Sequence, residues 1–177
     1  HGKTIDPKDS LTYEMMADDF AGLLDVMKID SAYVVGWSDG GINGLLLAIR
    51  HPEKVKKLAV TGANLRPDSS AVWSDILDMF KTPYKELNSK SNLTPEERTT
   101  KKLTNLLIEQ PNISPISLQH VLCPTLVIGG DNDVITVQHT VEIFSNVPQA
   151  YLWILHDSGH STAIRYANEF NSKVDAF

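Results

Sequence analysis

The sequence contains a single cysteine, Cys123, so no internal disulfide can form and the redox compartment stays open. No apolar run approaches the roughly 20 residues that a membrane-spanning helix needs. Lysine and arginine are scattered and the net charge is −6, which excludes the basic footprint of a nucleic-acid-binding protein. Histidine, cysteine and carboxylate residues do not cluster at metal-ligand spacing, so we expect neither a metal nor a cofactor.

What is present is the composition of an ordinary globular protein. The 177 residues are 42% hydrophobic and 21% charged, and a chain of this length can bury one sizeable core. The acidic balance weakly favours cationic over anionic ligands. We therefore expect a soluble protein, with a cytoplasmic location favoured, whose partners are neither nucleic acids nor membranes.

Strand and helix patterns alternate early in the chain. The β-branched run AYVVG (32–36) has the length of a buried strand, and KLAVTGA (57–63) predicts a second one. Between them, GINGLLLAIR (41–50) places apolar residues at helical intervals before Pro52 stops the helix. This strand–helix–strand unit indicates an α/β fold with a parallel sheet and a right-handed crossover.

A further helix is predicted before the first strand. Residues 12–28 carry large apolar side chains at the spacing of one helix face, and Thr12 can cap the start. The residues on this predicted face are Met16, Phe20, Leu23, Leu24 and Met27.

The alternation resumes late in the chain. The strands TLVIGG (125–130) and YLWIL (151–155) are each followed by a predicted helix, at 136–147 and 162–177.

No strand pattern occurs between residues 66 and 120. The stretches 70–80 and 95–109 predict helices, separated by the polar residues 85–94. We interpret this part as a helical insertion on the sheet and not as a separate domain. The predicted organisation is an α/β core, incomplete at its N-terminus, from residues 1–65 and 121–177, with the insertion at 66–120.

The segment GWSDG (36–40) carries the first chemical motif. It matches G-x-S-x-G, in which a strained strand-to-helix turn exposes a serine hydroxyl above the sheet. Ser38 has a predicted strand before it and a predicted helix after it, which is the context that the motif requires. We expect side chains at Gly36 and Gly40 to collide with the neighbouring strand and helix. The alternative is a glycine-rich turn with a capping serine.

A serine hydroxyl becomes a nucleophile when a base takes its proton and an acid orients the base. Two aspartates and two histidines follow the late strands. Asp133 can turn back over the sheet edge, whereas Asp131 is expected to bond its own turn. His160 lies free in its loop, whereas His156 is expected to be a partly buried histidine at its strand end. Because parallel strands end at one edge, we predict that Ser38, Asp133 and His160 meet there.

The remaining candidates are interpreted as structural. His51, His120 and His139 are expected on the surface. Cys123 precedes Pro124 at a strand start and is expected to be a small buried side chain and not a nucleophile.

Several segments together resemble the α/β-hydrolase family, and in particular its valacyclovir hydrolase (biphenyl hydrolase-like) branch. The resemblance spans nearly the whole chain and is diffuse across 66–120, where that family carries a variable lid. The matching segments are residues 1–64, in which GWSDGG and GAN (62–64) are specific to the branch, and CPTLVIGGDND and DSGH, which are similar to the acid and histidine segments of the family.

The resemblance implies a role for each motif residue. Ser38 would be the nucleophile, Asp133 the acid and His160 the base, and the backbone N–H of Asp39 would be one oxyanion donor. In amino-acid-ester hydrolases of the branch, the acidic residue after the nucleophile holds the α-ammonium group of the substrate, and Asp39 occupies that position. The alternative is that Asp39 caps or charges the N-terminus of the following helix.

Three further residues are assigned to the substrate pocket. They are Trp37 and Asn64 in the core and Trp73 in the region of the lid, where packing at helical spacing is the alternative.

The first residues, HGKT (1–4), are similar to the turn after the fourth strand of the family fold. The resemblance therefore implies that the first strands, and the loop with the second oxyanion donor, belong upstream of this segment. The strand at 32–36 would then be an exposed edge, open to a second copy of the chain. Losing one oxyanion donor lowers turnover about 10²–10³-fold, so we expect the isolated chain to be a poor catalyst.

The leading functional interpretation is a serine hydrolase that cleaves small-molecule carboxylic esters or amides through an acyl-enzyme, with α-amino-acid esters as one candidate class. One alternative is hydrolysis of a carbon–carbon bond by the same three residues. Another is a small-molecule receptor of the same fold without turnover, because a fold alone does not establish a function.

Overall fold

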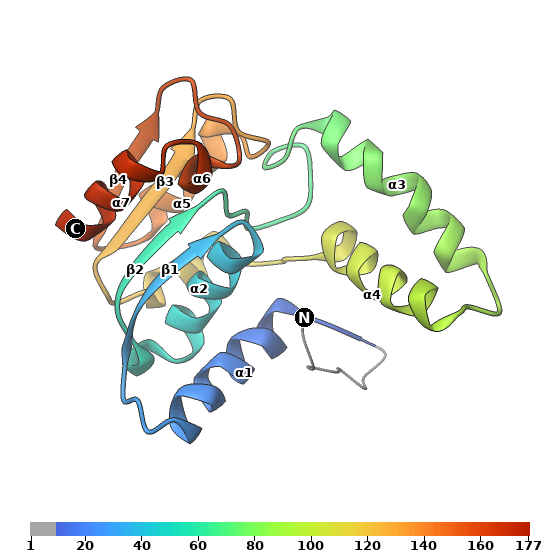
Figure 1. Ribbon diagram of the computed structural model, residues 1–177, viewed down its shortest axis with the longest axis horizontal. Helices are drawn as coiled ribbons and strands as arrows, with labels where there is room; N and C mark the ends of the chain where they lie inside the picture. Colours follow the sequence, from blue (N-terminus) through green and yellow to red (C-terminus); the bar gives the residue numbers. More distant parts are fainter. Residues whose placement is uncertain (1–9) are drawn as a thin grey trace.

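The computed structural model of the chain describes residues 10–177. Within these residues, four parallel strands form one sheet in the order β1-β2-β3-β4, as Figure 1 shows. The strands are β1 (Ala32–Trp37), β2 (Val55–Thr61), β3 (Thr125–Gly130) and β4 (Ala150–Leu155). Neighbouring strands follow one another in the chain and run parallel, so each connection crosses a face of the sheet. The predicted parallel α/β fold is confirmed, while the turn predicted at residues 1–4 lies outside the described residues.

Helices connect the strands and extend from the sheet. They are α1 (Tyr13–Val26), α2 (Asp39–Arg50), the 3₁₀ turn η1 (Pro52–Lys54), α3 (Ser74–Ser89), α4 (Pro95–Glu109), the 3₁₀ turn η2 (Pro115–His120), α5 (Val137–Asn146), α6 (Thr162–Arg165) and α7 (Ala167–Ala176). The last helix was predicted as one unit, but the structure divides it at Tyr166, whose φ of −116° and ψ of 39° are not helical.

The two faces of the sheet belong to different clusters of buried side chains. On β2, Leu58 and Val60 join the main core with side chains of α1, α2 and α5. Ala59, between them in sequence, joins a smaller cluster with Phe170 of α7. Alternation along a strand sends successive side chains to opposite faces, so this pattern gives a sheet covered by helices on both sides.

Helix α1 buries a different face from the predicted one. Its buried residues are Tyr13, Ala17 and Ala21, which also recur at helical spacing. Of the predicted stripe, Phe20 and Leu23 are about half exposed. The small alanines let α1 approach α2 closely, so Phe20, Leu23 and Met27 lie on the outer side. Met16, at the start of the predicted face, is partly buried against the core.

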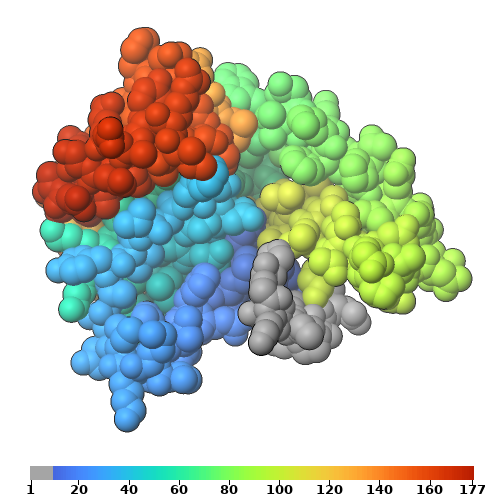
Figure 2. All heavy atoms as spheres, in the orientation of Figure 1, coloured from blue at the N-terminus to red at the C-terminus, as the bar shows by residue number. Residues whose placement is uncertain are grey.

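Helices α3 and α4 lie side by side and project away from the sheet, as Figures 1 and 2 show. We call residues 74–109 the helical arm. The predicted helix at 95–109 is confirmed, and Thr94 and Glu97 form a capping box at its start. Helix α3 differs from the predicted 70–80: it begins at Ser74 and continues to Ser89, halfway into the segment predicted as a polar separator. Tyr84 and Asn88 bond to α4 along this extension.

Backbone hydrogen bonds fix both ends of the arm to the core. Before α3, Val72 bridges Ile135, and the Trp73 N–H donates to the Val134 carbonyl at 3.1 Å. After α4, the Ile113 N–H donates to the Leu65 carbonyl at 2.9 Å. The arm therefore starts and ends on loops at the carboxyl edge of the sheet.

Candidate active site

Ser38 lies in a sharp turn between β1 and α2. Its φ of 57° and ψ of −122° are in a region that residues with a side chain rarely adopt. The Ser38 N–H donates to the Thr61 carbonyl of β2 at 2.8 Å, and its own carbonyl accepts the first bond of α2 from Ile42. These bonds hold the turn so that the serine side chain stands at the end of the strand.

The glycines around Ser38 differ in how much room a side chain would have. A methyl group at Gly36 would penetrate the backbone of Gly40, so no side chain fits there, as predicted. A methyl group at Gly40 would meet open space, so the predicted collision at Gly40 is wrong. The tight approach is made one residue later, at Gly41, where the added carbon would lie 3.0 Å from the side chain of Ala63.

The structure brings Ser38, His160 and Asp133 together at the carboxyl ends of β1, β3 and β4. The His160 Nε2 lies 2.9 Å from the Ser38 Oγ, and the His160 Nδ1 lies 2.7 Å from the Asp133 Oδ1. A carboxylate can only accept, so Nδ1 donates to Asp133 and Nε2 accepts from the serine hydroxyl. This is the arrangement in which an imidazole can take a proton from serine.

Asp133 is held by backbone and side-chain contacts of its own loop. Its side chain is 1% exposed, and its Oδ1 also accepts from the Ile135 N–H at 3.1 Å. Among the described residues, its Oδ2 is buried with no hydrogen-bond partner. Trp73 supports this loop, because its indole N–H donates to the Asp133 carbonyl at 2.9 Å.

Asp131 makes contacts with the histidine loop. Its Oδ2 lies 3.2 Å from the His156 Nδ1, and its Oδ1 accepts from the Ser158 N–H at 3.2 Å. It therefore joins the loop that carries His160 to β3, in addition to its contact with Asn132 in its own turn. The prediction that His156 is partly buried is wrong: its side chain is 96% exposed, because it points outward just past the strand end.

Gly62 was not singled out as a site residue, although it borders the histidine. Its φ is +63°, and an added methyl group would lie 2.8 Å from the His160 Cε1. Only glycine therefore combines this backbone with room for the imidazole. The sequence signal was a glycine directly after the strand KLAVT, in the segment GAN.

The three residues assigned to the substrate pocket all bond to loop backbone. The Trp37 indole N–H donates to the His160 carbonyl at 2.7 Å, and the two rings lie 5.9 Å apart. The Asn64 amide donates to the Arg66 carbonyl in its own loop. Trp73 is 54% exposed and lines a cavity beside Asp133. Their hydrogen bonds shape the loops around the site, and a contact with substrate stays a prediction.

His139 is fully buried, so its predicted surface position is wrong. Its Nε2 accepts from the Leu65 N–H at 2.9 Å, and its Nδ1 lies 3.1 Å from Glu142, which also pairs with Arg66. Burial lowers the pKa of His139, which keeps the ring neutral and able to accept. The helical period of α5 did not indicate which of its faces the Leu65 loop covers.

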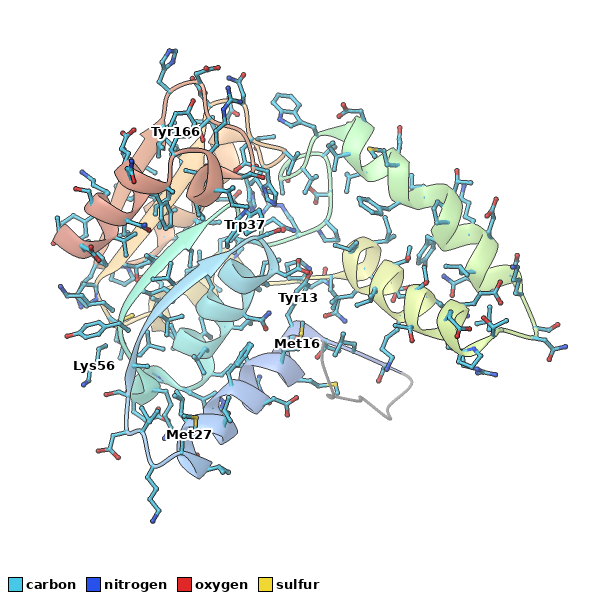
Figure 3. All side chains as sticks on the ribbon, in the orientation of Figure 1. Tyr13, Met16, Met27, Trp37, Lys56 and Tyr166 are labelled. Atoms are coloured by element: carbon cyan, nitrogen blue, oxygen red, sulfur yellow. The ribbon has the colours of Figure 1, made fainter. Side chains whose placement is uncertain are left out.

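Asp39 is the first residue of α2. Its N–H therefore has no carbonyl partner within that helix. That N–H is available beside Ser38, where an oxyanion would form. The Asp39 side chain is exposed, and its Oδ1 accepts from the phenol of Tyr13 at 2.8 Å. Figure 3 shows Tyr13 at the start of α1, near the beginning of α2. Tyr13 was not among the predicted site residues, and its signal in the sequence was the helical spacing of Tyr13, Ala17 and Ala21.

Residues 10–177 offer neither a metal site nor a membrane-spanning helix. No group of three or more histidine, cysteine, aspartate or glutamate side chains is placed to hold a metal ion. No helix in this part of the chain has the length and apolar character to cross a membrane.

The chain is similar to several known hydrolases. Mouse (Mus musculus) serine hydrolase BPHL is 26% identical over 176 residues, an alignment that covers 93% of this chain and 60% of the mouse protein. The 2-hydroxymuconate semialdehyde hydrolase of Pseudomonas sp. (strain CF600) is 27% identical, with coverage of 93% and 68%. The structure of a hydrolase from Pseudomonas aeruginosa PA01 has a TM-score of 0.76 at 18% identity, with coverage of 98% and 74%.

The chain thus spans about 60% of the length of the mouse and human BPHL proteins. A sequence profile described as the alpha/beta hydrolase fold matches residues 1–90, which is half of the chain. The parallel sheet, the strand-to-helix turn at Ser38 and this match lead to one conclusion: the chain belongs to the alpha/beta hydrolase fold family.

Proposed function

We propose that this protein hydrolyses small-molecule carboxylic esters or amides through an acyl-enzyme. The observation that carries the proposal is the continuous chain of contacts from the Ser38 Oγ through His160 to the buried Asp133. The similarity to serine hydrolase BPHL supports the same class of chemistry.

In the proposed reaction, the Ser38 Oγ attacks the substrate carbonyl while the His160 Nε2 takes its proton. Asp133 stabilises the imidazolium that forms, and the Asp39 N–H stabilises the negative charge on the carbonyl oxygen. His160 then gives the proton to the leaving alcohol or amine. Finally, His160 removes a proton from water, which attacks the acyl group and releases the acid and the serine.

We further propose that the favoured substrates carry an α-ammonium group. Asp39 places an exposed carboxylate one residue after the nucleophile, and no described residue donates to it from the backbone of α2. The helix-capping alternative therefore has no hydrogen bond to support it. A carboxylate next to the acyl centre attracts a cation and repels an anion.

The helical arm is proposed as a lid over this site. Both of its ends leave from loops that carry or contact site residues, since Trp73 supports Asp133 and Leu65 follows the Gly62 turn. Lids of this kind exclude water and select substrates. Substrate choice would then depend on arm residues that face the core.

Carbon–carbon bond hydrolysis is the second candidate. The similarity to 2-hydroxymuconate semialdehyde hydrolase favours it, because that chemistry can use the same three residues. The exposed carboxylate of Asp39 disfavours it, since it would repel an anionic ring-cleavage product.

A fluorophosphonate probe tests the proposed chemistry, because it reacts with an activated serine. We expect labelling of the chain at one residue, Ser38, and loss of labelling in Ser38→Ala and in His160→Ala. Ser158→Ala is the matched control and should label normally, since that serine is buried and bonds to Thr162. No labelling of Ser38, in this chain or in a full-length protein that contains it, would support the receptor alternative and contradict the enzyme.

A further inference from the structure

The side chain of Tyr13 reaches from α1 to the residue after the nucleophile. Its ring is 1% exposed, and its hydroxyl donates to the Asp39 Oδ1 at 2.8 Å. The backbone N–H of Tyr13 donates to the Gln110 Oε1 at 3.3 Å, just past the end of α4. Figure 3 shows this residue between the core and the helical arm. A phenol enclosed in this way has one fixed position from which to donate.

The contact leaves one half of the Asp39 carboxylate unused. The Oδ1 is occupied by the phenol, whereas no donor among the described residues bonds to the Oδ2. An aspartate at the start of a helix otherwise tends to fold back onto backbone N–H groups. By occupying the Oδ1, Tyr13 opposes that competing conformation.

Tyr13 remains a donor over the working range of pH. Burial, followed by the nearby Asp39 carboxylate, raises the pKa of Tyr13 far above the ordinary tyrosine value. The hydroxyl therefore keeps its proton and can donate to Asp39. A hydrogen bond between a phenol and a carboxylate is charge-assisted and stronger than a neutral one.

We propose that Tyr13 is a positioning residue that sets specificity: its phenol holds Asp39 in one orientation and leaves one carboxylate oxygen free for the ammonium group of a substrate. This inference rests on the function proposed above. Tyr13 itself touches neither the substrate nor the reacting atoms. Its effect is confined to ligands that use the Asp39 carboxylate.

The test uses Tyr13→Phe, which keeps the buried ring and removes the hydroxyl. The substrates are the p-nitrophenyl esters of valine and of isovaleric acid, which differ by the α-amino group. We expect Tyr13→Phe to raise KM for the valine ester about 5–10-fold, the net contribution of one ordinary hydrogen bond, with kcat nearly unchanged. The isovalerate ester should be hydrolysed as by the wild type.

Two further variants make the result specific. In an Asp39→Asn background, adding Tyr13→Phe should change the KM for the valine ester no further, because the two residues act as a unit. Tyr33→Phe is the matched control: its ring is 71% exposed on β1, and it should leave both KM values unchanged. Equal effects of Tyr13→Phe on both esters, or no effect on either, would overturn the inference.

A binding measurement separates failure of this inference from failure of the proposed function. The inactive Ser38→Ala protein is titrated calorimetrically with valinamide and with isovaleramide. We expect Tyr13→Phe to weaken binding of valinamide alone, by the same 5–10-fold. A wild-type protein that neither hydrolyses esters nor reacts with the fluorophosphonate refutes the proposed function, and equal binding of the two amides refutes the proposed preference for an α-ammonium group. Tighter binding of valinamide that Tyr13→Phe leaves unchanged refutes the inference alone.

Discussion

Ser38 illustrates how single residues create this site. A left-handed backbone costs a residue with a side chain about 1–3 kcal/mol. The Ser38 N–H is bonded to Thr61 and its carbonyl to Gly41 and Ile42, which holds the residue in that conformation. Gly36 makes the turn possible, because the chain folds back against it with no room for a side chain.

The unequal surroundings of the two motif glycines lead to a prediction. Gly36→Ala should lower the free energy of unfolding by about 1–3 kcal/mol or more, because overpacking forces the backbone to shift. Gly40→Ala should be neutral, or stabilise by up to about 1 kcal/mol, because alanine favours a helix. Urea unfolding monitored by circular dichroism measures both. Equal destabilisation by the two substitutions would contradict this view of the turn.

A second residue-scale prediction concerns Trp37. Its indole N–H holds the His160 carbonyl, so Trp37→Phe should loosen the histidine loop. A hydrogen bond of this kind contributes about 1 kcal/mol, so fluorophosphonate labelling of Ser38 should slow about fivefold. Trp153→Phe provides the matched control, since Trp153 packs in the smaller cluster against α7. An unchanged labelling rate in Trp37→Phe would contradict the view that Trp37 positions the histidine loop.

Among the elements, α1 and α2 are joined by a small ionic group as well as by packing. Asp18 of α1 accepts two hydrogen bonds from Arg50, at 2.8 and 2.7 Å, and lies 2.8 Å from the His51 Nε2. The bonds from Arg50, then His51, lower the pKa of Asp18 from 3.8 to about 2. The group is partly exposed, so its contribution to stability is that of a surface ion pair.

The lowered pKa gives this contact a defined dependence on pH. A carboxyl group whose pKa is lower in the folded state stabilises the protein above its unfolded pKa and loses that effect as pH falls toward the folded pKa. Asp18→Asn should therefore destabilise by about 0.5–1 kcal/mol at pH 7, and by progressively less between pH 3.8 and 2. Urea unfolding at pH 7, 5 and 3 measures the change.

Asp19→Asn is the control for that experiment. It removes the same charge from the next residue of α1, and Asp19 has no ion pair within the described part of the chain. Its effect should be small at each pH. If the loss of stability caused by Asp18→Asn grew as the pH fell, the predicted direction of the pH dependence would be wrong.

Sequence patterns predicted best the elements that a short apolar run or a helical period marks within the element itself. Short apolar runs predicted all four described strands, because strands of a parallel sheet are mostly apolar wherever helices cover the sheet. Helix α1 was placed correctly but with the wrong buried face, since Tyr13, Ala17 and Ala21 have the same period as the larger apolar side chains. Periodicity locates a helix, and only tertiary contacts select between two equivalent stripes.

In the candidate site, too, local sequence patterns predicted some features, and tertiary contacts decided the others. Ser38, Asp133 and His160 were predicted to meet, because motif, chain order and parallel strands constrain them together, and the structure has them in contact. The supporting contacts were not predictable. The burial of His139 and the room left by Gly62 depend on loops that pack from distant parts of the chain.

For the whole molecule, one edge of the sheet stands out. Strand β1 pairs with β2 on one side, and no strand among residues 10–177 pairs with its other side. Its outward residues Tyr33 and Val35 are 71% and 55% exposed, because α7 covers only the far part of that face. An open apolar edge of this kind invites pairing with another strand.

We propose that copies of the chain associate through this edge. Sedimentation velocity should show self-association that increases with concentration, and Val35→Lys should shift the chain toward monomer, because lysine blocks edge pairing. Val141→Lys, on α5, is the control and should sediment as the wild type does. Identical behaviour of wild type and Val35→Lys at every concentration would exclude association through β1.

The fixed ends of the helical arm also define where this scaffold can be redesigned. Residues 71–73 belong by their hydrogen bonds to the loop of the acid, and Ile113 belongs to the loop after β2. We expect the helical arm, residues 74–109, to be exchangeable as a unit, because Gln110 and its contact with Tyr13 then stay in place. A graft joined a few residues before Trp73 would remove the backbone hydrogen bonds between residues 71–73 and the loop of Asp133. The junctions of a chimaera therefore belong at Trp73 and just before Gln110.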